Sequence, residues 1–170
     1  MFQGLIVAVI AVLVGLDQLT KWLTTVYIKP VEDGITIIPH VLDFSYVENQ
    51  GAAWGVFDGE RWFLVALTSI VILALLVFVL VGKLRRFPMF NISAVLIIAG
   101  GIGNLIDRLV NGFVVDFIKT TFMSFPVFNV ADCFVVIGSV LLLVFFLFFY
   151  EEKTPAEAVN GNKTDDSSGS

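Results

Sequence analysis

Cysteine, histidine and charge are all scarce in this sequence of 170 residues. The single cysteine excludes an internal disulfide and any cysteine-based zinc cluster, and the single histidine excludes a histidine-rich metal site. Only 15% of the residues are charged, against about 25% in an average soluble domain. The net charge of −5 argues against nucleic acid as a partner. A soluble globular enzyme is therefore nearly excluded.

Hydrophobic residues make up 58% of the chain and are gathered into long runs, and the mean hydropathy is +0.94. A transmembrane helix needs about 20 mostly apolar residues. We predict four such spans, at about residues 5–26, 62–81, 92–110 and 127–149. The expected fold class is an all-α membrane protein, a bundle of four transmembrane helices in one domain covering residues 1–150.

The distribution of lysine and arginine predicts how the spans are oriented. The connection between the second and third spans contains Lys83, Arg85 and Arg86, whereas the other two loops are poor in basic residues. Short basic loops stay in the cytoplasm, so we expect the other loops outside and both termini inside. The polar segment 151–170 is expected to be a disordered cytoplasmic tail.

The first outer loop, at about residues 30–58, has the composition of a folded segment. Residues 34–39 and 41–47 are rich in β-branched and aromatic side chains, and Leu42 and Phe44 alternate with polar residues. Such alternation is typical of half-buried strands. We predict a small antiparallel β-sheet that lies on the outer membrane surface.

Polar residues within the spans are predicted to lie at one depth. At about 1.5 Å per helical residue, those of the first and third spans lie roughly 18–24 Å from the inner start of their helices. Asp132 lies about one turn below the outer start of the fourth span. A charge inside a span is costly and marks a functional site by default. One layer near the outer leaflet therefore contains Asp17, Lys21, Asn104, Asp107, Arg108 and Asp132.

Several of these residues also have a structural interpretation. Asp17 and Lys21 are four residues apart and can form an ion pair that allows a polar helix turn to enter the membrane. Arg108 can pair with Asp107 or extend toward the membrane interface. The asparagines of the third and fourth spans can form interhelical hydrogen bonds.

Asp132 is harder to explain structurally, because its own helix carries no lysine or arginine within one turn. Asp116 follows the third span closely and can return to the same layer. Two neighbouring aspartates can share one proton, since like charges a few ångström apart cannot both ionise. The pair can then activate water and protonate a carbonyl, which is peptide hydrolysis without metal or cofactor. The residues alone leave this hypothesis open against a transporter or a proton relay.

Five sequence blocks, in this order across the four spans, resemble those of the bacterial lipoprotein signal peptidases, also called type II signal peptidases. Any one block is a weak signal, but the five together are highly specific and cover residues 5–150. The blocks are Asp17-Gln18-Leu19-Thr20-Lys21, Asn49-Gln50-Gly51-Ala52-Ala53-Trp54-Gly55, Gly100-Gly101-Ile102-Gly103-Asn104-Leu105-Ile106-Asp107-Arg108, Val114-Val115-Asp116-Phe117 and Phe128-Asn129-Val130-Ala131-Asp132.

The resemblance implies an aspartyl endopeptidase of the bacterial inner membrane that needs no cofactor. It implies that Asp116 and Asp132 are the catalytic pair. It further implies that a prolipoprotein is cut just before its diacylglyceryl-modified cysteine. The residues implied to bind substrate or support the site are Asn49, Gly51, Asn104, Arg108 and Asn129. Asp17 and Lys21 match a pair that supports the structure, and we expect the same of Asp107.

The expected partners are diacylglyceryl prolipoproteins and membrane lipid, with the protein a monomer and its active site near the outer leaflet. The alternatives are a small proton-coupled transporter and a non-catalytic membrane scaffold. A transporter would need polar residues at several depths, and a scaffold would tolerate Asp132→Asn. The sequence departs from the family pattern at Phe125, where many members have tryptophan, and at Cys133, where many have serine.

Overall fold

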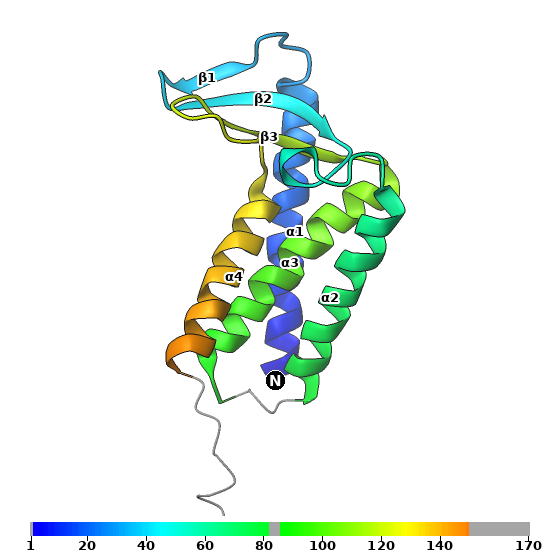
Figure 1. The fold of residues 1–170 in the computed structure, drawn as a ribbon, viewed down its shortest axis with the longest axis vertical. Coiled ribbons are helices and arrows are strands. Elements are labelled where there is room, and N and C mark those ends of the chain that lie inside the picture. Colours follow the sequence, from blue (N-terminus) through cyan, green and yellow to red (C-terminus); the bar gives the residue numbers. More distant parts are fainter. Residues whose placement is uncertain (1, 82–85, 150–170) are drawn as a thin grey trace, which may run out of the picture.

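The computed structural model describes residues 2–81 and 86–149, and it contains four long helices arranged as a bundle (Figure 1). They are α1 (Phe2–Tyr27), α2 (Arg61–Val81), α3 (Pro88–Val110) and α4 (Val130–Phe148). All four are long and apolar enough to cross a membrane, so the predicted four-helix class is confirmed. The predicted tail at 151–170 lies outside the described residues, as do Lys83 and Arg85, on which the predicted orientation depends.

Helix α3 is the centre of the bundle. In its most apolar 18-residue window 61% of the residues are buried, against 11–17% in the other helices. Small residues allow α4 to approach it closely. A methyl group on Gly138 of α4 would lie 2.8 Å from the carbonyl oxygen of Ser93, and one on Gly100 would collide with the carbonyl oxygen of Ala131. Glycine is needed here because the two backbones are nearly in contact.

The end of the bundle away from the sheet is apolar. Phe145 of α4 lies at its centre, with ring centroids 5.1 Å from Phe87 and 5.8 Å from Phe90. Helix α3 begins at Pro88, earlier than the predicted residue 92. Its first turns tolerate polar side chains because Asn91 donates a hydrogen bond to the carbonyl oxygen of residue 87. The buried cluster consists of Ile6, Val79, Phe90, Ala94, Val95 and Phe145.

The opposite end carries a three-stranded antiparallel sheet of order β1-β2-β3 (Figure 1). The strands are β1 (Ile35–Ile38), β2 (Leu42–Asn49) and β3 (Val114–Thr120). The predicted sheet is confirmed in its first two strands. The third was not predicted, because residues 114–117 are all buried and show no alternation of polar and apolar side chains.

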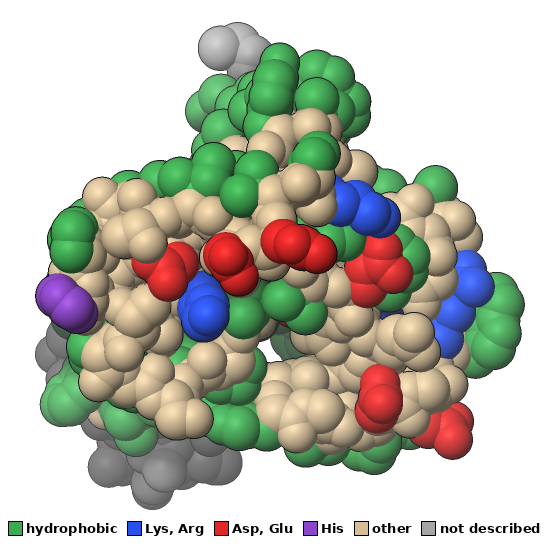
Figure 2. Space-filling model, turned by 90° about the horizontal axis from the view of Figure 1, so that it is seen from above, with side chains coloured by type: hydrophobic (Ala, Val, Ile, Leu, Met, Phe, Trp, Pro, Cys, Tyr) green, Lys and Arg blue, Asp and Glu red, His purple; other side chains and the backbone are tan. Residues whose placement is uncertain are grey.

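The face of the molecule that carries the sheet displays several charged side chains. Viewed from this side, acidic and basic side chains gather over the sheet and the loops around it (Figure 2). After β2 the chain forms a short 3₁₀ helix, η1 (Ala53–Gly55), whose central Trp54 is exposed and has a positive φ of 56°. The sheet and this loop lie at the end of the bundle where α3 ends and α4 begins (Figure 1).

Candidate active site

Asp116 and Asp132 lie in the wall of one cavity of about 610 Å³. Strand β3 carries Asp116, which is paired in register with Val47 of β2. Asp132 lies in the first turn of α4. The rest of the wall is mostly apolar and includes Trp54, Phe125, Pro126, Phe128, Val135, Val136 and Ile137. The two aspartates that the sequence singled out are thus brought to the same space from different elements.

The start of α4 holds the side chain of Asp132 in place. Asn129 is the N-cap, and its Oδ1 accepts a hydrogen bond from the backbone N–H of Asp132 at 3.0 Å. In return, Oδ2 of Asp132 accepts from the backbone N–H of Asn129 at 3.0 Å. This reciprocal capping box satisfies two N–H groups of the first turn. The helix begins three residues later than the predicted 127, because Phe128 is paired with Ile118 of β3.

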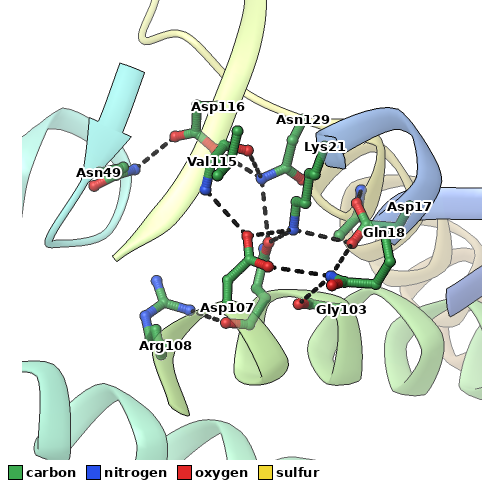
Figure 3. A network of polar contacts seen from close by, with 12 residues as sticks. Asp17, Gln18, Lys21, Asn49, Gly103, Asp107, Arg108, Val115, Asp116 and Asn129 are labelled. Atoms are coloured by element: carbon green, nitrogen blue, oxygen red, sulfur yellow. Dashed lines mark hydrogen bonds and ion pairs between the residues drawn. The ribbon is translucent and has the colours of Figure 1, made fainter. Parts of the chain in front are cut away.

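Three asparagine amides hold the remaining carboxylate oxygens, and Figure 3 shows the two that donate to Asp116. Nδ2 of Asn129 donates to Oδ1 of Asp116 at 2.7 Å, and Nδ2 of Asn49 donates to Oδ2 of the same carboxylate at 2.8 Å. Nδ2 of Asn104 donates to Oδ1 of Asp132 at 2.7 Å. Every oxygen of the two carboxylates therefore accepts a hydrogen bond. Asn129 bonds to both aspartates.

A second layer of polar side chains lies behind these amides. Nζ of Lys21 lies 2.9 Å from Oδ2 of Asp17 and 3.1 Å from Oδ2 of Asp107, and it donates to Oδ1 of Asn104 at 2.9 Å. The side chain of Lys21 is only 3% exposed. The predicted ion pair within α1 is confirmed, and the predicted meeting of polar residues from three helices is confirmed by these contacts.

Arg108 does not pair with Asp107, and the ion-pair interpretation of these neighbours was wrong. The carboxylate of Asp107 forms an ion pair with Nζ of Lys21, while Nη2 of Arg108 donates to the carbonyl oxygen of Gly51 at 2.9 Å. The backbone N–H of Gly51 donates to Oδ1 of Asn49 at 2.9 Å, so both residues of this block belong to the site. Across the described part of the chain, Nε of Arg108 is one of the few buried side-chain atoms without a hydrogen-bond partner.

Two site residues were not singled out from the sequence. Gln18 donates to Oδ1 of Asp107 at 3.1 Å and to the carbonyl oxygen of Gly103 at 3.2 Å. Its place beside Asp17 in the first block was the available signal. Cys133, noted in the sequence only as a departure from the family pattern, lines the cavity next to Asp132. No pattern in the sequence indicated which side of α4 would face a cavity.

Burial raises the pKa of Asp116 from 3.8 to about 6. The hydrogen bond from Asn49 acts in the opposite direction, and the nearby carboxylate of Asp132 raises the pKa further. A carboxyl group with such a pKa can hold or release a proton near neutral pH. Within residues 2–81 and 86–149 no group of three or more His, Cys, Asp or Glu side chains is placed to hold a metal ion.

A family model described as signal peptidase (SPase) II matches residues 9–148. The chain belongs to the signal peptidase II family. Two relatives, each named lipoprotein signal peptidase, illustrate the similarity. That of Enterococcus faecalis is 35% identical over 89% of this chain and 91% of its own length. That of Lactococcus lactis is 39% identical over 87% of this chain and 98% of its own length.

Two solved structures described as bacterial membrane enzymes have the same fold as this member of the signal peptidase II family. One, at 2.3 Å resolution, gives a TM-score of 0.80 at 32% identity and covers 91% of this chain and 96% of its own. The other, at 1.9 Å, gives 0.78 at 34% identity and covers 88% and 97%. With its four apolar helices, this signal peptidase II family member is a multi-pass protease of the bacterial inner membrane.

Proposed function

We propose that this protein removes the signal peptide from diacylglyceryl-modified prolipoproteins by cutting just before the lipidated cysteine. Its relatives are named lipoprotein signal peptidases. The observation that carries the proposal is the placing of Asp116 and Asp132 in the wall of one cavity, with Asn129 bonded to both. The substrate's lipid explains why the rest of the wall is apolar.

The proposed reaction uses one proton shared between the two aspartates. The ionised carboxylate takes a proton from water, and the water oxygen attacks the scissile carbonyl carbon. The protonated partner gives its proton to the carbonyl oxygen, which produces a tetrahedral diol. A proton then passes to the peptide nitrogen, the C–N bond breaks, and the signal peptide leaves with a carboxylate. Water supplies every atom that is added.

The surrounding residues have distinct roles in this proposal. Asn49, Asn104 and Asn129 orient the carboxylates with neutral donors, so the charge of the pair is set by its proton. Arg108 lines the cavity and holds the loop at Gly51 through Nη2. Such positioning converts a bound peptide into a reactive one.

The apolar part of the cavity is proposed to take the acyl chains of the substrate. Val136 and Ile137 of α4 line it and are also exposed on the outside of the bundle. Lipid chains could therefore enter from the membrane without crossing water. This requires the site to lie near the outer leaflet, with the charged sheet face outside and both termini in the cytoplasm. We expect the protein to act as a monomer.

A proton-coupled transporter fits the described helices less well. The cluster around Phe145 at the other end of the bundle is apolar. The buried polar side chains in that half, Asn91 and Ser93, donate to carbonyl oxygens of their own helix. The described residues thus offer no chain of titratable groups through the membrane.

The decisive experiment is a gel-shift cleavage assay with purified protein and a diacylglyceryl-modified prolipoprotein. Wild type should release the signal peptide, while Asp116→Asn and Asp132→Asn should lower the rate by at least about 10³-fold. Asp33→Asn replaces an exposed aspartate and is the matched control, expected to cut normally. The same prolipoprotein without its lipid should remain intact.

Intact substrate with folded wild type would contradict the proposal. Normal cleavage by either Asp→Asn variant would remove that aspartate from the mechanism. If a contaminant then proved to cut the substrate, a non-catalytic membrane scaffold would be the better interpretation of this protein.

A further inference from the structure

The two carboxylates bonded to Lys21 each hold one backbone N–H of the active site (Figure 3). Oδ2 of Asp107 accepts from the N–H of Val115 at 3.0 Å. Oδ1 of Asp17 accepts from the N–H of Ala131 at 2.9 Å. Val115 and Ala131 are the residues that immediately precede the two reacting aspartates. The ammonium of Lys21 therefore contacts both of the carboxylates, one of which holds β3 and the other α4.

The third contact of Lys21 determines which way an amide faces. Oδ1 of Asn104 accepts from Nζ of Lys21 at 2.9 Å, so the NH₂ group of this amide must point away from the ammonium. It points at Asp132, to which it donates. The same Oδ1 also accepts from Nδ2 of Asn129 at 3.1 Å. A reversed amide would place NH₂ against the ammonium and leave Asp132 without its donor.

Lys21 reaches all three supports but does not reach the substrate space. Its side chain is 3% exposed, and it is not among the residues that line the cavity. An ammonium has three N–H donors, and here each faces an oxygen: one on Asp17, one on Asp107 and one on Asn104. Without the ammonium, the carboxylates of Asp17 and Asp107 would repel each other in a buried space.

We propose that Lys21 is the positioning residue of the catalytic pair, and that its ammonium sets the separation and orientation of Asp116 and Asp132. The proposal rests on the proposed function. It assigns to this lysine an effect on the chemical step, beyond the support of the fold expected from the sequence. Its distinguishing consequence is that loss of Lys21 lowers turnover without weakening substrate binding.

The charge of Lys21 gives a second consequence that packing alone would not produce. The charged groups acting on Asp116 are Asp132 from α4, Arg108 from α3 and Lys21 from α1. Lys21 favours the ionised form of Asp116 and so lowers its pKa. Removing this positive charge should raise the pKa of Asp116 and move the alkaline limb of the activity profile to higher pH.

The test compares Lys21→Met with Lys29→Met in the full-length enzyme, using the diacylglyceryl prolipoprotein. For Lys21→Met we expect kcat to fall about 10²-fold, the loss typical of an ångström-scale misplacement, with KM changed less than about twofold. The alkaline limb should rise by well under one pH unit, because Lys21 is the weakest of the named influences on the pKa of Asp116. Lys29 is exposed and bonded to Glu48 on the sheet. Lys29→Met should therefore have the same kcat, KM and pH profile as wild type.

Lys21→Arg provides the second variant, because a guanidinium keeps the charge but its planar donors cannot meet the three oxygens in the same directions. We expect the alkaline limb at its wild-type position and a kcat between those of wild type and Lys21→Met. If Lys21→Met does not fold, as judged by thermal unfolding and gel filtration in detergent, the Arg variant decides. A wild-type kcat in a folded Lys21→Arg protein would overturn the proposal.

The proposal is also overturned if folded Lys21→Met keeps kcat within about threefold of wild type, or if its alkaline limb does not move. A wild type that cuts while Lys21→Met cuts equally well refutes this inference alone. A wild type that leaves the lipidated substrate intact refutes the proposed function instead. The two failures are therefore distinguishable in one experiment.

Discussion

Two pairs of carboxylates lie in the same polar network, and their partners differ. Asp17 and Asp107 both contact the ammonium of Lys21. Asp116 and Asp132 accept hydrogen bonds from neutral amide and backbone N–H groups. A cation holds the first pair in place, whereas neutral donors leave the charge of the second pair to a proton. In the proposed mechanism, the kind of partner separates the supporting carboxylates from the reacting ones.

The largest change in stability is expected at the supporting pair. Asp17→Asn leaves the buried Lys21 with one carboxylate where it had two, and breaking a buried ion pair in this way costs about 3–5 kcal/mol. Thermal unfolding in detergent should therefore show a clear decrease in Tm. The isosteric Asp33→Asn on the exposed loop provides the control. An unchanged Tm would mean that the ammonium needs only one carboxylate.

At the reacting pair the same substitution should have the opposite effect. The pKa of Asp116 is about 6 in the folded protein against its ordinary 3.8, so the folded state binds this proton more tightly. Its contribution to stability is complete below pH 3.8, decreases as pH rises toward 6, and above that is about 3 kcal/mol less favourable. Asp116→Asn removes this cost, and its Tm at pH 7.5 should equal or exceed that of wild type. A decrease as large as that of Asp17→Asn would contradict the comparison.

Activity should depend on pH through the same proton. Because the pair works with one proton shared between its carboxylates, kcat/KM should fall above about pH 6, roughly tenfold for each pH unit. A profile measured with the lipidated substrate at several pH values checks this. Activity that stays level to pH 9 would show that the substrate raises the pKa much further or that the pair is not the titrating group.

A smaller shift should follow from the removal of one neutral donor. The hydrogen bond from Asn49 lowers the pKa of Asp116, so Asn49→Ala should move the alkaline limb upward by less than about one pH unit. The rate at the optimum should fall about tenfold as the carboxylate loses one orienting contact. A downward shift would mean that Asn49 bonds to the protonated form of the aspartate.

The smallest effect is expected for charged residues on the sheet. Nζ of Lys29 lies 3.0 Å from Glu48, whose carboxylate also accepts from the hydroxyl of Tyr46 at 2.9 Å. Exposed pairs of this kind contribute little, so Glu48→Gln should change Tm by no more than about 1 °C and leave cleavage unaffected. A larger loss would assign this pair a role in holding the sheet over the site.

The helices could be predicted, and the two aspartates could be singled out, because their signals in the sequence are local. A run of about 20 apolar residues predicts a transmembrane helix, and a charged residue within that run marks a candidate functional site. Asp132 was singled out because no cation lies near it on its own helix. Strand β3 escaped prediction because residues 114–117 are buried on both faces, which removes the alternation that marks a half-buried strand.

The partners of the polar residues could not be predicted, because they depend on how the helices pack. Arg108 was expected beside Asp107, but a neighbour in sequence faces another side of the helix, and the carbonyl of Gly51 lies in its reach. The sequence does not indicate which backbone N–H groups donate to Asp17 and Asp107. Every backbone position has an N–H group except proline, so only the fold selects which one is used.

The hydrogen bond from Ala131 to Asp17 joins positions 114 residues apart, one in the first helix and one at the start of the last. At about 5–20 residues per second, a ribosome needs roughly 6–23 s to make the intervening chain. Until then Asp17 has no partner at the start of α4, although Lys21 can already contact Asp107 and Asn104 of α3. In the proposed mechanism, activity therefore begins only once α4, which carries Asp132, has been inserted.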